Sequence, residues 1–78
     1  MSTKEQIANI LKEIKPTKDL TDVQDIIESG YLDSFELMSL IAQLSETFNI
    51  EIDVDEIIPE NFNSAQALYE LVTRLADE

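Results

Sequence analysis

The amino-acid sequence contains no cysteine and no histidine in 78 residues. The absence of cysteine excludes disulfides and thiolate metal sites. The absence of histidine leaves a nucleophilic serine without its usual general base. Paired carboxylates could do acid–base work, but no pair stands apart among the 17 acidic residues. We therefore expect that this chain is not an enzyme and has no catalytic residue of its own.

Glycine and proline are also scarce, with one Gly and two Pro. This scarcity favours long helices joined by few tight turns, and a single glycine excludes a glycine-rich phosphate-binding loop. Because 44% of the residues are apolar, the chain is too hydrophobic to be a disordered tail. At this length we expect one domain over residues 1–78.

Long hydrophobic runs are missing as well. No stretch approaches the roughly 18 apolar residues of a membrane span, and no signal peptide opens the chain. We therefore expect a soluble, cytoplasmic monomer that does not insert into a membrane.

Positive charge is absent from the middle of the chain. The segment Asp19–Glu60 has twelve acidic residues and no Lys or Arg, and the net charge of the chain is −12. The five basic residues lie outside this segment, at Lys4, Lys12, Lys15, Lys18 and Arg74. An acidic segment of this kind repels nucleic acid and anionic membranes, and it attracts proteins with basic docking patches. The alternative is that the acids only keep a small protein soluble.

Acidic helical chains can bind calcium, so the spacing of the acids matters. An EF-hand loop needs oxygen ligands at alternating positions, followed by a glycine for the turn. Asp53 and Asp55 begin such a spacing, but Ile57 stands at the next ligand position and Ile58 replaces the glycine. The sequence therefore predicts no specific metal site.

Helical periodicity marks three long segments. The first predicted helix spans about Thr3–Ile14, with Ser2 or Thr3 as its cap and Pro16 as its end. The last predicted helix spans about Ala65–Ala76 and is capped by Ser64. Their predicted buried faces comprise Ile7, Ile10, Leu11 and Ile14 in the first helix, and Leu68, Leu71, Val72 and Leu75 in the last.

The second predicted helix spans Ser34 to about Phe48 and has apolar residues on two sides. Its predicted buried stripe comprises Leu37, Leu40, Ile41, Leu44 and Phe48. Phe35, Met38 and Ala42 fall outside this stripe, interleaved with polar residues such as Glu36 and Glu46. A small domain normally fills its outer face with polar residues, so this second strip favours a docking surface. The alternative is that Met38 flanks the core and Phe35 lies under the preceding loop.

The connections complete an all-α fold. The long first connection, about Lys15–Asp33, is expected to tuck its apolar residues against the bundle and to form one short helical turn. After the second helix we expect an extended link, a short third helix around Val54–Ile58 broken by Pro59, and Phe62 in the core. The predicted architecture is a small four-helix bundle with three main helices, one short third helix and a long first loop.

The start of the second helix has the strongest local signal. Asp33 can act as the N-cap, and Glu36 can reach back to complete a capping box. Ser34 would then lie in the first turn, where free backbone N–H groups and the helix dipole favour an anion. A phosphate ester on Ser34 would be well placed there.

The segment from Gly30 to Met38 resembles the attachment site of acyl carrier proteins. The core signature of that family is Asp-Ser followed by an apolar residue at the start of the second helix, which here reads Asp33-Ser34-Phe35. The length, acidity, four-helix plan and long first loop extend the resemblance over nearly the whole chain. The resemblance implies an acyl-carrier-type fold and a carrier rather than a catalyst.

The resemblance also implies a cofactor and partners. A phosphopantetheinyl transferase would move 4′-phosphopantetheine from coenzyme A onto Ser34, and the thiol of the arm would hold acyl or aminoacyl groups as thioesters. Loading and processing enzymes with basic docking patches would then exchange that cargo. The recognition face that the family uses corresponds here to the following residues: Phe35, Glu36, Met38, Ala42, Glu46, Glu51 and Glu56.

The cargo stays open at this stage. Phe35 stands where the family usually has Leu, and Ser39 stands where fatty-acid carriers usually have an acid. Fatty-acid, polyketide and related biosynthesis all remain candidates, as does a specialised carrier of an amino acid such as D-alanine. From another class, the alternative is an acidic helical interaction module without a prosthetic group.

Overall fold

The computed structural model describes residues 2–77. It contains α1 (Thr3–Ile14), the 3₁₀ turn η1 (Leu20–Asp22), α2 (Ser34–Phe48), the 3₁₀ turn η2 (Val54–Glu56), α3 (Pro59–Phe62) and α4 (Ala65–Ala76). There is no strand within residues 2–77. The predicted all-α bundle with three main helices is therefore confirmed.

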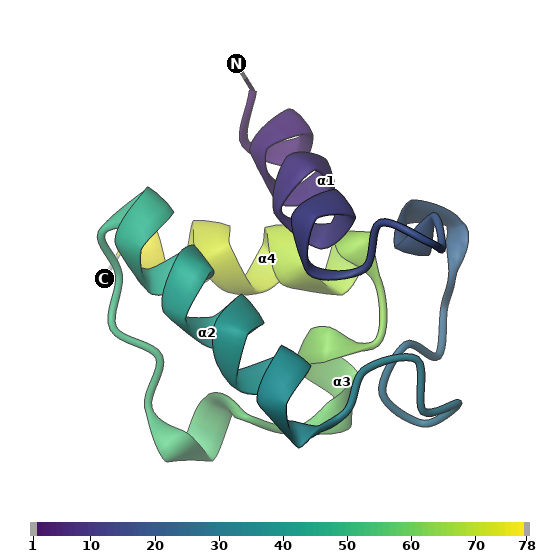
Figure 1. Cartoon of the computed structure of the whole chain (residues 1–78). Helices are drawn as coiled ribbons and strands as arrows, with labels where there is room; N and C mark the ends of the chain where they lie inside the picture. Colours follow the sequence, from purple (N-terminus) through teal and green to yellow (C-terminus); the bar gives the residue numbers. More distant parts are fainter. Residues whose placement is uncertain (1, 78) are drawn as a thin grey trace.

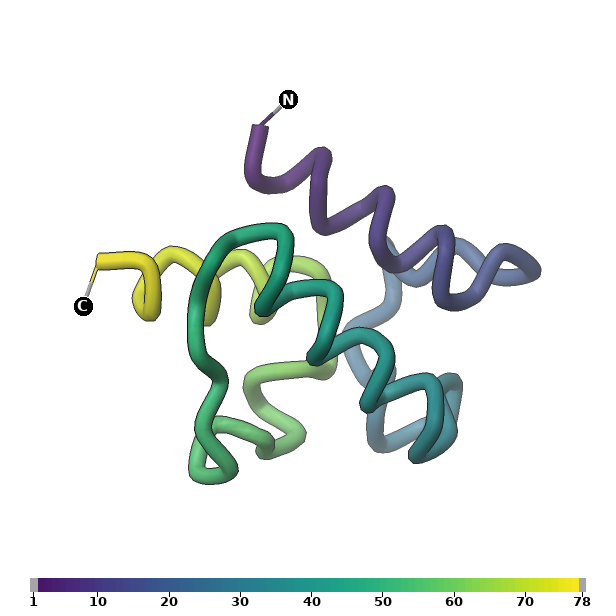
Figure 2. Tube along the Cα trace, turned by 60° about the vertical axis from the view of Figure 1, so that its left-hand side comes forward, coloured from purple at the N-terminus to yellow at the C-terminus, as the bar shows by residue number. Residues whose placement is uncertain are grey.

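The three long helices pack against one another. α1 contacts both α2 and α4, and α2 also contacts α4 (Figures 1 and 2). The short helix α3 packs on α4. The long connection before α2 runs along one edge of the molecule, and the link after α2 runs along the opposite edge (Figure 1). The long connection therefore leads directly into the start of α2 at Ser34.

The core confirms most of the predicted buried positions. Among residues 2–77, twelve apolar side chains are buried: Ile7, Ile10, Leu11, Leu20, Ile26, Leu32, Leu40, Leu44, Phe62, Leu68, Leu71 and Val72. The remaining residues of the predicted stripe on α2, together with Ile14 and Leu75, are partly buried and pack around this set. Phe62 lies in the core as predicted, with 1% of its surface exposed.

Asn63 fastens the long connection to the bundle. Its side-chain Oδ1 accepts hydrogen bonds from the backbone N–H groups of Ile27 (3.0 Å) and Glu28 (3.3 Å), and its carbonyl oxygen accepts one from Ile26 (2.9 Å). Together with the burial of Leu20 and Ile26, these bonds hold a segment that has only η1 as regular structure. The expected short helical turn in this connection is confirmed as η1.

The prediction for the third helix was wrong in its placement. We expected a helix at Val54–Ile58 broken by Pro59, but Val54–Glu56 forms only a 3₁₀ turn and α3 begins at Pro59. Proline at the first helical position loses no hydrogen bond, because that N–H has no partner inside the helix, and its fixed φ suits the helix. Pro59 therefore starts α3 rather than ending the helix before it.

No helix between residues 2 and 77 combines the length and the apolar composition needed to cross a membrane.

Candidate functional site

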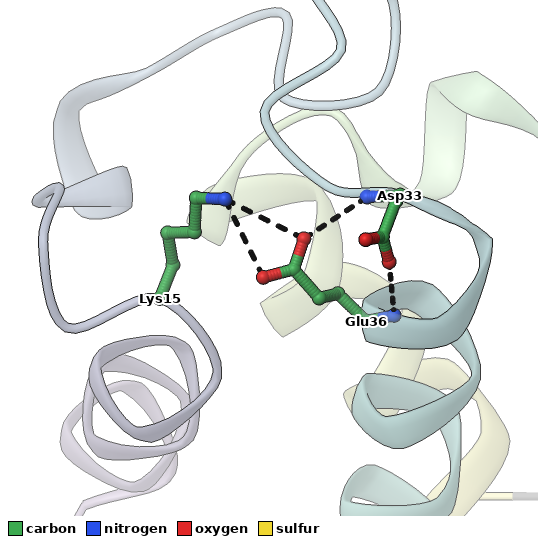
Figure 3. Close-up of polar contacts among 3 residues, drawn as sticks. All are labelled: Lys15, Asp33 and Glu36. Carbon is green, nitrogen blue, oxygen red and sulfur yellow. Dashed lines mark hydrogen bonds and ion pairs between the residues drawn. The ribbon is translucent and has the colours of Figure 1, made fainter.

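The start of α2 is closed by a complete capping box. Asp33 is the N-cap, with extended backbone angles, and its Oδ1 accepts the backbone N–H of Glu36 at 2.7 Å. In return, Oε1 of Glu36 accepts the backbone N–H of Asp33 at 3.1 Å (Figure 3). Two N–H groups that a helix start leaves without partners are satisfied in this way. The predicted capping box is confirmed, and it fixes the backbone on both sides of Ser34.

Ser34 lies at the first position of α2 and is exposed. Within residues 2–77 the structure has no hydrogen bond to the backbone N–H groups of Ser34 and Phe35. These two donors, together with the positive end of the helix dipole, suit an anionic group. The Ser34 hydroxyl is therefore accessible, and a phosphodiester on it would fit the local field.

A third side chain, from the C-cap position of α1, contacts the capping box. Nζ of Lys15 lies 3.5 Å from Oε1 and 3.4 Å from Oε2 of Glu36 (Figure 3). Both side chains are partly buried, with 31% and 23% of their surfaces exposed. Sequence reasoning missed this contact, because 21 residues separate the two positions and no local pattern connects them.

The outer strip of α2 is exposed. Phe35 and Met38 expose 80% and 67% of their surfaces, and Ala42 is exposed on the same helix. Phe35 therefore does not lie under the preceding loop. Glu46 and Glu51 are also exposed. Two further exposed apolar residues, Val54 and Ile58, follow α2 in the link, and sequence reasoning did not single them out.

Comparison with known proteins identifies the family to which the chain is related. A family model described as a phosphopantetheine attachment site matches residues 4–72. A D-alanyl carrier protein of Lactobacillus delbrueckii subsp. bulgaricus is 35% identical over 80 residues, which cover 100% of this chain and 99% of that protein. A D-alanyl carrier protein of Streptococcus suis is 34% identical over 77 residues, which cover 96% of each chain.

The chain belongs to the phosphopantetheine carrier protein family. This membership confirms the resemblance and gives the chain a covalently attached 4′-phosphopantetheine as its prosthetic group. It also removes the alternative of an interaction module without a prosthetic group. A phosphopantetheinyl transferase and enzymes that load and process the cargo are the partners that a carrier protein requires.

Two of the acids expected to dock carrier-protein partners have contacts within the chain. Glu36 is held by Lys15 and by the capping box. Glu56 forms a two-pronged pair with Arg74, whose nitrogens lie 3.0 and 2.8 Å from its two oxygens, and Asn61 also donates to it. The Arg74 guanidinium is the main reason why the pKa of Glu56 lies below its ordinary value. Both carboxylates therefore have partners within the chain, and their part in docking stays a prediction.

Proposed function

We propose that Ser34 is the residue that carries the phosphopantetheine of this protein, and that the cargo is an aminoacyl group, D-alanine. The observation that supports the site best is the position of Ser34 in the capping box at the start of α2, with an exposed hydroxyl and two free backbone donors beside it. D-alanyl carrier proteins that match over their whole length support the cargo.

The other serines are less suitable. The hydroxyls of Ser2 and Ser64 cap α1 and α4, and Ser64 is also buried. The hydroxyl of Ser29 donates to Asp25 at 2.6 Å. Ser39 and Ser45 lie inside α2 and are only partly exposed. Ser34 alone among the described serines combines exposure with a helix start and a hydroxyl without a hydrogen bond to another residue.

The prosthetic group and the residues around Ser34 have different roles in the proposed function. The prosthetic group supplies the thiol that the cysteine-free chain lacks. Asp33 and Glu36 fix the backbone around Ser34, and the backbone N–H groups of Ser34 and Phe35, which have no partner within residues 2–77, would be available to the phosphate. Phe35, Met38, Ala42, Glu46 and Glu51 provide the surface on which partner enzymes dock. The chain itself contributes no general acid or base to the chemistry.

Intact mass spectrometry tests the attachment site. Incubation of the full chain with coenzyme A and a promiscuous phosphopantetheinyl transferase is expected to add about 340 Da, the mass of the phosphopantetheinyl group. Ser34→Ala should fold normally and gain no mass, whereas the control Ser39→Ala should gain it. Modification that persists in Ser34→Ala would refute the site.

A loading assay tests the cargo. The modified chain is incubated with ATP, an amino-acid-activating ligase that accepts D-alanine, and either D- or L-alanine. D-alanine should appear as a mass gain that hydroxylamine removes, as expected for a thioester, and L-alanine should load more slowly. Failure to load D-alanine, together with efficient loading of malonyl groups by a malonyl transferase, would assign the chain to fatty-acid or polyketide chemistry instead.

A further inference from the structure

Lys15 occupies a fixed place at the end of α1. It is the C-cap residue of that helix, and its backbone N–H donates to the carbonyl of Leu11 at 2.9 Å. Pro16 follows it and restricts its backbone further, because the proline ring narrows the conformations of the preceding residue. The root of the Lys15 side chain is therefore held, which lowers the entropy lost when its ammonium group binds Glu36.

The ammonium group of Lys15 is the first step in a chain of contacts that ends at Ser34. Lys15 contacts both oxygens of Glu36, and one of these oxygens accepts the backbone N–H of Asp33 (Figure 3). Asp33 immediately precedes Ser34 and in turn accepts the backbone N–H of Glu36. The lysine at the C-cap of α1 therefore anchors the Glu36 side chain, which orients the peptide before Ser34.

The charge of Lys15 is unusual in this position. The segment Asp19–Glu60, which surrounds the attachment serine, contains no base of its own. If Lys15 acted only through long-range charge, it would weaken the attraction of a basic partner to the acidic surface around α2, and its removal would help docking. Its partly buried contact with Glu36 points instead to a local structural role, in which removal of Lys15 would slow the modification of Ser34.

We propose that Lys15 is a positioning residue for the modification of Ser34. By holding the Glu36 carboxylate, it keeps the capping box closed and the Ser34 hydroxyl in the orientation that the transferase uses. The inference rests on the proposed attachment at Ser34. Lys15 acts through Glu36 and touches neither coenzyme A nor the reacting hydroxyl.

Transferase kinetics on the full chain test this role. Lys15→Met keeps the length and the apolar stem of the side chain but removes its charge, and it should lower kcat about fivefold with KM unchanged, in keeping with the loss of a partly exposed ion pair. Lys15→Arg should restore the rate. Lys12→Met is the matched control, because Lys12 is exposed on the same helix and its loss changes the net charge equally. It should leave kcat unchanged.

Hydrogen exchange of the Asp33 amide provides a readout that needs no transferase. In the chain before modification, this amide should exchange about fivefold faster in Lys15→Met than in the wild type, because the bond to Glu36 is weakened. Lys12→Met should leave the rate unchanged. Amides in the middle of α2 should keep their protection in all variants.

A double-mutant cycle tests whether Lys15 acts through Glu36. In the Glu36→Ala background, Lys15→Met should cause no further loss of kcat, because the carboxylate that pairs with the Lys15 ammonium group within residues 2–77 is gone. Additive losses would show that Lys15 acts without Glu36 and would overturn the proposal. Equal effects of Lys15→Met and Lys12→Met, or a change in KM alone, would also overturn it. A wild-type chain that gains no mass would instead refute attachment at Ser34. The exchange rate of the Asp33 amide would still show whether Lys15 stabilises the bond between Glu36 and Asp33.

Discussion

Both faces of α2 carry apolar side chains, but one face is buried and the other is exposed. Leu40 and Leu44 have no exposed surface, whereas Phe35 and Met38 lie mostly in solvent. A small domain gains stability by burying apolar surface, so the two exposed side chains forgo a contribution that the fold could have used. The difference indicates that one face of α2 holds the bundle together, and it supports the proposal that the other face serves recognition beside Ser34.

Truncating the buried face should have the largest effect. Leu44→Ala removes a fully buried side chain and leaves a cavity that the packed helices cannot fill, so the free energy of unfolding should fall by about 3 kcal/mol. Urea denaturation followed by circular dichroism measures this loss. A change below about 1 kcal/mol would mean that the core closes around the cavity and that the two faces differ less than their burial indicates.

Truncating the exposed face should leave stability almost unchanged. Phe35→Ala and Met38→Ala should each change the free energy of unfolding by less than about 0.5 kcal/mol. Each should weaken binding of the transferase by about tenfold if these side chains anchor the interface. Binding is measured by calorimetry on the Ser34→Ala chain, which cannot be modified at that position. A loss of several kcal/mol in stability would place the residue in the core and end the docking interpretation.

The sequence predicted what depends on neighbours along the chain. The bounds of α1, α2 and α4 follow from apolar periodicity and from caps at Ser2, Asp33 and Ser64, each bonded to a residue three positions away. Pro59 shows the limit of this local reasoning, because proline is compatible both with the end of one helix and with the first position of the next.

Contacts between distant segments could not be predicted in this way. Asn63 bonds to residues 35 and 36 positions away, Glu56 pairs with Arg74 across 18 positions, and Lys15 pairs with Glu36 across 21. Each depends on which helices pack together and at what angle. Sequence reasoning could therefore identify Ser34 as the candidate serine. It could not predict that Lys15 contacts Glu36 or that Arg74 pairs with Glu56.

Charge reversal should separate recognition from capping on α2. Glu46→Lys should slow association with a basic partner a few-fold at low ionic strength and leave stability unchanged, because Glu46 is exposed. Glu36→Lys should slow association and also lower stability, because it breaks the capping box and faces Lys15. Stopped-flow association rates and thermal melts measure both quantities. Equal stability losses in the two variants would contradict the contacts of Glu36.

Screening should have the smallest effect, and it should act on the exposed acids alone. Twelve acids lie between Asp19 and Glu60, and lysine or arginine from outside that segment pairs with Glu36 and Glu56. The remaining acids repel one another and oppose compaction. Physiological salt or millimolar divalent cations should therefore raise the melting temperature by about 2 °C, measured by calorimetry.

The size of that gain should depend on charge and not on the core. It should be the same in Leu44→Ala as in the wild type, since screening does not reach a fully buried leucine. It should shrink when Glu51, Asp53 and Asp55 are neutralised together. Magnesium and calcium should act alike, because within residues 2–77 no group of three or more acidic side chains is arranged to hold a metal ion. A tight site selective for calcium over magnesium would contradict the screening explanation, because diffuse repulsion gives no basis for choosing between two ions of equal charge.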